Sequence, residues 1–258
     1  MYNYYNMKIQ EILHYVTNFI FPKHCVICDE LLPFGVGINS DFLCDKCKDK
    51  LEFIEEPTCK KCGAKIYEKD EGLCDNCKEK IKANNSYFEY GFGLLRYNNF
   101  VKESIHRIKY NSKKEYIEFY AKMLARVFHE NIKQINPDCF VPVPIHKDRE
   151  RERGYNQSLV LADILSKELR KYDIDVPVNV HLITREKKTM ALNKLSTNER
   201  QIELNNAFFV DNSDGKKRVM IVDDIYTTGT TIETMSKILK ENGVRESFFV
   251  CIAVVDNT

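Results

Sequence analysis

From residue 86 to the end of the chain, short apolar runs alternate with longer amphipathic stretches. The apolar runs predict strands at 88–97 (a strand pair), 138–146 (strand and loop), 178–184, 207–210, 217–224 and 247–256. The amphipathic stretches predict helices at 99–110, 113–130, 156–172 and 231–243. Strands that alternate with helices indicate an α/β fold, in which helices flank both faces of a mostly parallel sheet.

The first twenty residues place apolar side chains at helical spacing on one face, which predicts an amphipathic helix over residues 1–20. Polar and charged residues, among them Lys8, Glu11 and His14, interrupt this face too often for a signal-peptide core or a membrane span. We expect the helix to pack on the body of the protein. A helix that binds a partner or a membrane surface is the alternative.

The composition sets the broad class of protein. The 258 residues are 43% hydrophobic and 30% charged, with a net charge of +1. This hydrophobic content suffices for a real core, and the near-neutral charge gives no global field that would recruit nucleic acid or membrane. With no signal peptide predicted, we expect a cytoplasmic protein whose thiols stay reduced.

Eight of the ten cysteines form four Cys-x-x-Cys pairs. These pairs are Cys25/Cys28, Cys44/Cys47, Cys59/Cys62 and Cys74/Cys77. Thiolates at this spacing chelate a tetrahedral metal ion, and two pairs complete a four-sulfur zinc site. The sequence therefore predicts two structural Zn²⁺ ions, with redox-active dithiols as the alternative. The spacing does not decide how the pairs combine, although combination in chain order is the simplest arrangement.

Residues 21–82 are expected to form a double zinc-ribbon domain. The segment is rich in cysteine and charge and poor in long apolar runs, so metal binding must supply much of its folding energy. Its basic and acidic residues nearly balance, without the basic, aromatic-laced face typical of nucleic-acid binding. A structural role or the docking of a protein partner is therefore favoured.

The stretch VMIVDDIYTTGTT (219–231) ends an apolar strand in two acids, followed by threonines around a glycine. Ligands of α/β sheets bind beyond the carboxyl ends of the strands, where Asp223 and Asp224 are expected to reach opposite faces. The following residues offer hydroxyl and backbone N–H groups to an anion at a helix start. They are Thr227, Thr228, Gly229, Thr230 and Thr231. This combination predicts a sugar-phosphate site; an ordinary helix capped by one threonine is the alternative.

A second expected strand tip, VPVPIH (141–146), precedes a segment that contains Arg149, Arg151 and Arg153. Guanidinium groups suit planar, bidentate contacts with phosphate, so these arginines are candidates for neutralising a pyrophosphate. Acidic residues alternate with them, and a solvated charged face is therefore the alternative.

The 219–231 stretch resembles the phosphoribosyl-pyrophosphate signature of type I phosphoribosyltransferases. Together with RERGYNQ (151–157) and the four Cys-x-x-Cys pairs, it resembles the ComF/GntX family, which is associated with bacterial competence and DNA utilisation. The resemblance covers nearly the whole chain, from FPKHCVIC (21–28) onward. It implies a type I phosphoribosyltransferase-like domain over residues 86–258, with a small N-terminal zinc-ribbon domain before it.

The resemblance also implies roles for single residues. Asp223 and Asp224 would hold the ribose hydroxyls and act in catalysis, and Thr227–Thr231 would hold the 5′-phosphate. Mg²⁺ would be bound mainly through oxygens of the substrate. Lys109 matches a lysine that the family carries, and its alternative is a lysine on a helix surface.

Residues 183–201 lie where type I enzymes carry a hood that closes over the sugar, with Arg185 and Arg200 as its candidate basic residues. Leu192 and Glu203 depart from the family pattern, which has Gln and Asn there. A surface loop without a ligand role is the alternative.

Two functions follow from the resemblance. The first is a Mg²⁺-dependent phosphoribosyltransferase that acts on a nitrogen nucleophile such as a nucleobase. The second is a non-catalytic factor that binds phosphoribosyl pyrophosphate and serves DNA uptake, docking through its zinc ribbons. Single-stranded DNA and a protein of the DNA-uptake machinery are the partners that this second function implies.

Overall fold

The computed structural model describes residues 22–32, 42–67, 72–185, 207–210 and 215–256. The expected helix over residues 1–20, Arg200 and most of the expected hood lie outside this part. The chain divides into two compact units, residues 1–51 and 52–258, and each holds one pair of Cys-x-x-Cys motifs. The sequence-based domain limits, at residue 20 and between residues 82 and 86, stay predictions.

The first unit contains the first zinc-ribbon site. Residues His24 and Leu31 form an antiparallel bridge around the tight turn that carries Cys25 and Cys28. The 3₁₀-helix η1 (Asp45–Lys50) begins directly after Cys44 and contains Cys47. Each half of the site is therefore a short turn held by its two cysteines, as expected of a segment with little apolar core.

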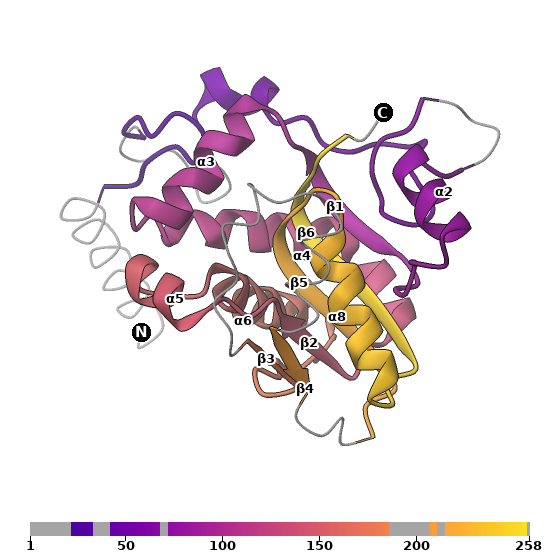
Figure 1. Ribbon diagram of the computed structural model, residues 1–258. Coiled ribbons are helices and arrows are strands. Elements are labelled where there is room, and N and C mark those ends of the chain that lie inside the picture. Colours follow the sequence, from indigo (N-terminus) through magenta and orange to yellow (C-terminus); the bar gives the residue numbers. More distant parts are fainter. Residues whose placement is uncertain (1–21, 33–41, 68–71, 186–206, 211–214, 257–258) are drawn as a thin grey trace, which may run out of the picture. The chain divides into compact units, whose positions relative to one another are not determined.

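The second unit is built on a four-stranded sheet (Figure 1). The strands are β1 (Gly91–Arg96), β6 (Glu246–Val254), β5 (Arg218–Tyr226) and β2 (Cys139–Pro142), in that spatial order. All three neighbouring pairs are parallel. A separate antiparallel pair joins β3 (Ile183–Arg185) to β4 (Phe208–Val210). The sequence prediction of a mostly parallel sheet is confirmed.

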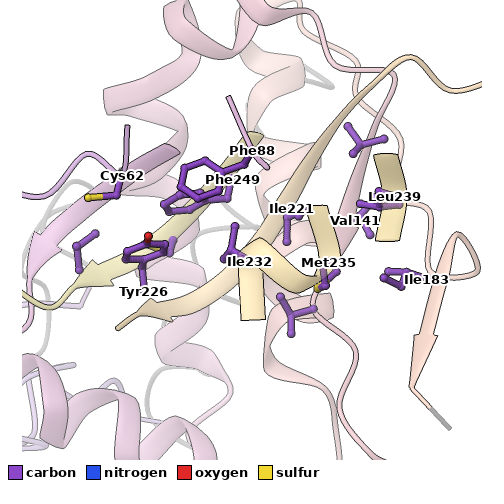
Figure 2. Close-up of a cluster of buried hydrophobic side chains, with 14 of the residues drawn as sticks. Cys62, Phe88, Val141, Ile183, Ile221, Tyr226, Ile232, Met235, Leu239 and Phe249 are labelled. Atoms are coloured by element: carbon purple, nitrogen blue, oxygen red, sulfur yellow. The ribbon is translucent and has the colours of Figure 1, made fainter. Parts of the chain in front are cut away.

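Helices cover both faces of this sheet. They are α3 (Asn99–Tyr110), α4 (Glu115–Ile135), α5 (Lys147–Arg153), α6 (Gln157–Leu169) with the turn η2 (Arg170–Tyr172), and α8 (Thr230–Glu241). α8 packs Met235 against Ile221 on one face (Figure 2). Because successive strand residues point to opposite faces, the buried Met220 and Val222 face the other side, where α6 lies against β2 and β5.

The second zinc-ribbon site is part of the core of the second unit. Its four cysteines share one buried cluster with Phe88, Tyr226 and Phe249 (Figure 2). Helix α2 (Asp75–Lys82) begins directly after Cys74 and contains Cys77. This ribbon therefore covers the same side of the sheet as α8.

Three local predictions were wrong or incomplete. Residues 88–97 form the single strand β1 rather than a strand pair, because Gly91 and Gly93 let the chain lie straight against Phe249 and Val254. Within 178–184, only the end joins a strand, β3, while Val178 makes one isolated bridge to Phe140. No element was expected at 147–153, where the structure has helix α5, which Gly154 ends with a φ of 81°.

Candidate functional site

The two adjacent acids lie on β5, at the point where one of its two neighbouring strands ends. Strand β2 ends at Pro142, which pairs with Val222 of β5, whereas β6 continues beside β5 as far as Tyr226. Asp223 is therefore the first residue of β5 beyond the end of β2. The acids are held by strand backbone on one side and face the carboxyl edge of the sheet on the other, the usual ligand position in α/β folds.

Asp223 is held by two hydrogen bonds to one of its oxygens. Ser158 Oγ of α6 donates to Oδ1 at 3.1 Å, and the backbone N–H of Asp224 donates to the same oxygen at 2.9 Å. Burial, followed by the charge of Asp224, raises the pKa of Asp223 to about 7. In this state of the protein the carboxyl group is therefore close to balance between its protonated and ionised forms near neutral pH.

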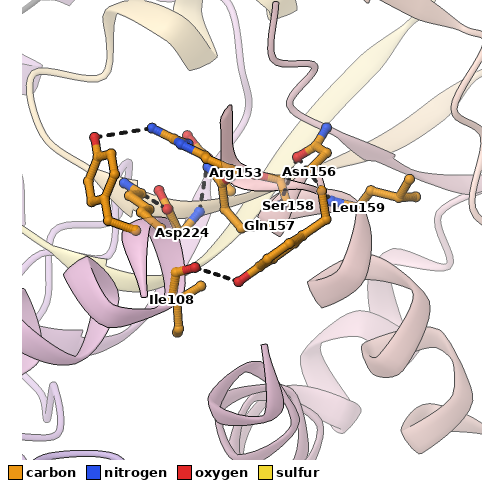
Figure 3. Close-up of polar contacts among 11 residues, drawn as sticks. Ile108, Arg153, Asn156, Gln157, Ser158, Leu159 and Asp224 are labelled. Carbon is orange, nitrogen blue, oxygen red and sulfur yellow. Dashed lines mark hydrogen bonds and ion pairs between the residues drawn. The ribbon is translucent and has the colours of Figure 1, made fainter. Parts of the chain in front are cut away.

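Asp224, the next residue of β5, meets a different helix. Its Oδ2 lies 2.7 Å from Nζ of Lys109, which α3 supplies from its last turn (Figure 3). The side chain of Asp224 is 8% exposed and that of Lys109 is 19% exposed. Asp223 therefore contacts α6 and Asp224 contacts α3, and the prediction that the two acids reach opposite faces of the sheet stays a prediction.

The loop after β5 leads into α8 through a glycine in the left-handed conformation. Gly229 adopts a φ of 74° and is the N-cap residue of α8. Because glycine has no side chain, the N-cap position itself offers no acceptor for the first N–H groups of the helix. Thr228 Oγ1 instead lies 2.9 Å from Thr230 Oγ1. A threonine at the N-cap of an ordinary helix is therefore not what the structure shows, while the dipole of α8 leaves a positive end at this loop.

A second group of positive charge comes from α5 and β3. Arg185 at the end of β3 is buried, and its guanidinium carbon lies 5.6 Å from the ring centroid of Phe208. Burial, followed by the positive charge of Arg149, lowers the pKa of Arg185 to about 10. A buried guanidinium close to a second positive charge is a favourable place for an anion.

The remaining arginine candidates differ in their surroundings. Arg151 is exposed and lies 3.8 Å from Asp148 on the same helix. Arg153 donates to Gln157 Oε1 at 3.0 Å and to the Tyr110 hydroxyl at 3.4 Å (Figure 3). Arg153 is thus committed to contacts within the fold, and Arg151 is not brought to the acids by any contact in the described part of the chain.

The RERGYNQ element anchors two helices beside the acids. The Tyr155 hydroxyl donates to the carbonyl of Ile108 in α3 (Figure 3). Asn156 caps α6 through the N–H groups of Ser158 and Leu159, and its amide donates to Val143 O at 3.1 Å. These bonds fix the ends of α3 and α6 that carry the partners of Asp224 and Asp223.

Three neighbours of the candidate site were not predicted from the sequence. Ser158 contacts Asp223, and Tyr226 and Glu233 flank the loop after β5 on either side. Tyr226 and Glu233 stand inside or beside the 219–231 stretch, but an aromatic residue and an acid there have no pattern of their own. Ser158 had one usable signal, since it directly follows the RERGYNQ element.

Both four-cysteine sets are assembled for a metal ion. Within each set the sulfur atoms lie within 4.8 Å of one another, and the pairs combine in chain order. The distances are 3.7 Å between Sγ of Cys28 and Cys44, and 3.6 Å between Sγ of Cys62 and Cys74. Tetrahedral zinc with bonds of about 2.3 Å requires sulfur separations of about 3.8 Å, so both sets fit structural Zn²⁺.

Two backbone groups add to this arrangement. The N–H of Cys44 donates to Sγ of Cys25 at 3.5 Å, and the N–H of Cys74 donates to Sγ of Cys59 at 3.3 Å. The same bond at the same place in both sets stabilises thiolates, as expected of ligands in a zinc ribbon. The first set is partly exposed at Cys28 and Cys44, whereas all four cysteines of the second set are buried.

Comparison with known families agrees with this organisation. Residues 16–78 match the family described as a double zinc ribbon domain, and residues 155–257 match the phosphoribosyl transferase domain. The zinc-ribbon family thus matches the part of the chain that holds both cysteine sets, and the phosphoribosyl transferase family matches the part that holds β5 and α8.

Curated relatives place the chain more narrowly. Competence protein ComFC of Bacillus subtilis is 26% identical over 231 residues, which cover 85% of this chain and 89% of that protein. Competence protein F of Haemophilus influenzae is 38% identical over 113 residues, or 43% and 47% of the two chains. DNA utilization protein YhgH of Escherichia coli K12 is 31% identical over 144 residues, or 54% and 60%. The chain is thus similar in sequence to proteins named for competence and DNA utilisation, and its matches span 47% and 60% of the length of two of them.

Solved structures with some likeness include two phosphoribosyltransferases. The purine enzyme of Pyrococcus horikoshii is 23% identical with a TM-score of 0.34, covering 53% of this chain and 73% of that one. The hypoxanthine-guanine enzyme of Schistosoma mansoni, in complex with IMP, is 14% identical with a TM-score of 0.32, covering 56% and 66%. Likeness at this level carries no argument about the site. Within the described residues, no helix is long and apolar enough to cross a membrane.

Proposed function

We propose that the β5 acids and the loop Thr227–Thr231 bind phosphoribosyl pyrophosphate together with Mg²⁺. The observation that carries this proposal is the junction of β5 and α8. There two adjacent carboxylates near the end of β5 are followed by a short loop. This loop leads to Gly229, the N-cap residue of α8, in the left-handed conformation. Carboxylates accept hydrogen bonds from vicinal hydroxyl groups, and the helix start favours a phosphate.

The charges around the acids support the same ligand. Lys109 lies against Asp224, and Arg149 and Arg185 form a second positive group. In our proposal Lys109 is near the ribose and the leaving pyrophosphate, and Arg149 and Arg185 contact the pyrophosphate. Mg²⁺ would then be held mainly by phosphate and ribose oxygens, since this ion keeps few protein ligands in such sites.

The proposed reaction is phosphoribosyl transfer. The bond between C1 of the ribose and the pyrophosphate oxygen breaks, its electron pair leaves with pyrophosphate, and a nitrogen acceptor forms the new bond to C1. Positive charge spreads over the ribose ring in such a transition state. Asp223 and Asp224 would stabilise that charge, and the acceptor nitrogen gives up its proton to water or to a neighbouring base.

A second candidate is a protein that binds phosphoribosyl pyrophosphate without turning it over and serves DNA uptake. The observation that favours it is the set of relatives named for competence and DNA utilisation. In this function the zinc ribbons dock a protein of the uptake machinery, and single-stranded DNA is a partner. A binding site on a fold does not by itself establish catalysis.

We further propose a cytoplasmic location, supported by eight cysteines that are arranged as thiolate ligands rather than as disulfides.

Pyrophosphate release distinguishes the two candidates. The full-length chain is incubated with phosphoribosyl pyrophosphate and Mg²⁺, alone and with each of a panel of nucleobases or single-stranded DNA. Release that requires one acceptor and is lost in Asp224→Asn supports the transferase. Thermal stabilisation by the ligand without any release supports the binding protein. If the chain shows no pyrophosphate release and no thermal stabilisation, the proposed ligand is refuted.

A further inference from the structure

Helix α2 of the second zinc ribbon lies against the loop Thr227–Thr231, which is named the anion loop. Its residue Asn76 donates from Nδ2 to the carbonyl of Thr228, a long hydrogen bond of 3.5 Å. Asn76 directly precedes Cys77 and lies two residues after Cys74, the N-cap residue of the helix. The part of the ribbon that carries two metal ligands therefore touches the backbone of the loop directly.

Lys80, one turn further along α2, makes two more contacts with the same region. Its Nζ lies 3.4 Å from the Tyr226 hydroxyl and 3.6 Å from Oε1 of Glu233. Its side chain is 16% exposed and that of Glu233 is 4% exposed. The ammonium group and the carboxylate are both largely buried, so they are expected to stay in contact. Separating them would leave each as a buried charge without a partner, which is energetically unfavourable.

Glu233 connects this lysine to the first turn of α8. Its Oε2 accepts the backbone N–H of Tyr87 at 2.8 Å, while Oε1 faces Lys80. Burial raises the pKa of Glu233, and Lys80 and the N–H of Tyr87 oppose that rise. Glu233 thus links the ribbon, the segment before β1 and the start of α8.

Tyr226 forms the floor of the loop. Its ring stacks on Phe249 with centroids 4.7 Å apart and planes 3° apart, and it is buried in the same cluster as Cys62 (Figure 2). A Cβ atom on Gly229 would lie 2.2 Å from the Tyr226 hydroxyl and 2.6 Å from Nζ of Lys80. The loop backbone therefore rests directly on the pair formed by Tyr226 and Lys80.

We propose that the second zinc ribbon positions the anion loop, and that Lys80 is its main positioning residue, acting through Tyr226 and Glu233. This inference concerns the ligand that we propose for the loop, and the part of it that concerns affinity rests on that function. Thermodynamic linkage makes the effect mutual, because a ribbon that stabilises the ligand-binding shape of the loop is itself stabilised when a ligand holds that shape.

The test compares four variants of the full-length chain. Lys80→Met removes the ammonium group and keeps the length of the side chain. Lys80→Arg keeps the charge, and Lys80→Met with Glu233→Gln removes both charges together. Lys82→Met, at an exposed position of the same helix, is the matched control. Zinc content and far-UV circular dichroism establish that each variant retains its metal and fold.

Two readouts separate this inference from the proposed function. Hydrogen–deuterium exchange of residues 227–231 reports the loop without any ligand, and calorimetric titration with phosphoribosyl pyrophosphate and Mg²⁺ reports affinity. We expect faster exchange and an affinity about fivefold or more weaker in Lys80→Met, recovery in Lys80→Arg, and wild-type behaviour in Lys82→Met. If Lys80→Met does not fold, the doubly neutral variant carries the same expectation.

The outcomes are distinct. If hydrogen–deuterium exchange of residues 227–231 is equal in Lys80→Met and Lys82→Met, the inference is overturned, whether or not the ligand binds. Equal affinities in those two variants, in a protein that binds the ligand, overturn it as well. Wild type that does not bind the ligand refutes the proposed function instead, and loop exchange then decides the positioning role alone.

Discussion

Nζ of Lys109 lies 2.7 Å from Oδ2 of Asp224, so the last turn of α3 neutralises one of two adjacent acids on β5. The other acid, Asp223, has no cation in contact and is held by the Ser158 hydroxyl and a backbone N–H within the described structure. The pair is thus asymmetric. One carboxylate contacts a lysine, and the other accepts hydrogen bonds from neutral donors in a buried setting.

The contact between Lys109 and Asp224 predicts a specific pattern of stability. Lys109→Met leaves a buried carboxylate beside a second acid and should lower the free energy of unfolding by roughly 2–3 kcal/mol. Adding Asp224→Asn removes the orphaned charge, so the double variant should recover part of that loss. Chemical denaturation measures both. A double variant less stable than Lys109→Met would show that the pair does not behave as a charge pair.

Stability should depend on pH through Asp223. Its pKa is about 7 in the folded chain, against about 3.9 when unfolded. From about pH 4 to about pH 7 the folded chain keeps a proton that the unfolded chain has released, so the contribution of this group to the free energy of unfolding falls as pH rises. Asp223→Asn lacks that fall and should gain stability relative to wild type across this range. Denaturation at several pH values measures the difference.

Asp138 provides a control of opposite sign. Its carboxylate accepts the N–H groups of Lys217 and Arg218, which lower its pKa. Its stabilising contribution is present at neutral pH and is lost as the pH falls below about 4. Asp138→Asn should therefore be most destabilising, relative to wild type, at neutral pH. If both variants showed the same slope with pH, the assignment of the slope to Asp223 would be wrong.

Two glycines with left-handed backbone allow the cost of backbone strain to be measured apart from the cost of a steric clash. Gly154 has a φ of 81° and open space around it, so Gly154→Ala should cost only about 1–2 kcal/mol of stability. Gly229 has a φ of 74°, and an added Cβ would also collide with Tyr226 and Lys80. Gly229→Ala should cost clearly more and should abolish ligand stabilisation in a thermal shift assay. Equal costs for the two substitutions would contradict the close packing under the loop.

The two zinc sites should differ in their effect on the second unit. Cys62→Ser removes a ligand within the core cluster and should lower the melting temperature of that unit by roughly 6–12 °C, for about 3 kcal/mol of lost stability. Cys28→Ser removes the same kind of ligand from the first unit and should leave that transition in place. Calorimetry and zinc content measure this, and equal losses in both variants would be evidence against it.

The sequence was most informative where chemistry requires a fixed spacing. The Cys-x-x-Cys pairs predicted two four-sulfur sites, because a tetrahedral ion accepts few arrangements of thiolates. The alternation of apolar and amphipathic segments predicted the parallel sheet, and β5, α3 and β6 lie close to where they were expected. Asp223 and Asp224 both lie near the carboxyl end of β5, where the 219–231 stretch placed them.

The rest depends on contacts between distant segments. Lys80 stands in CKEKIK, where it reads as an ordinary helix lysine, and only the fold brings it to Tyr226 and Glu233, about 150 residues later. The order in which cysteine pairs combine is also a three-dimensional property. The strand pair expected at 88–97 was wrong, because Gly91 and Gly93 allow the single strand β1 to approach β6 closely.

The most direct test of the central claim is a calorimetric titration of the full-length chain with phosphoribosyl pyrophosphate in the presence of Mg²⁺, repeated with Asp224→Asn. We predict saturable binding at one site in wild type and an affinity at least about tenfold weaker in the variant, or 1.4 kcal/mol. Wild type that gives no binding heat and no thermal stabilisation, or a variant that binds as tightly as wild type, would contradict the assignment of this site.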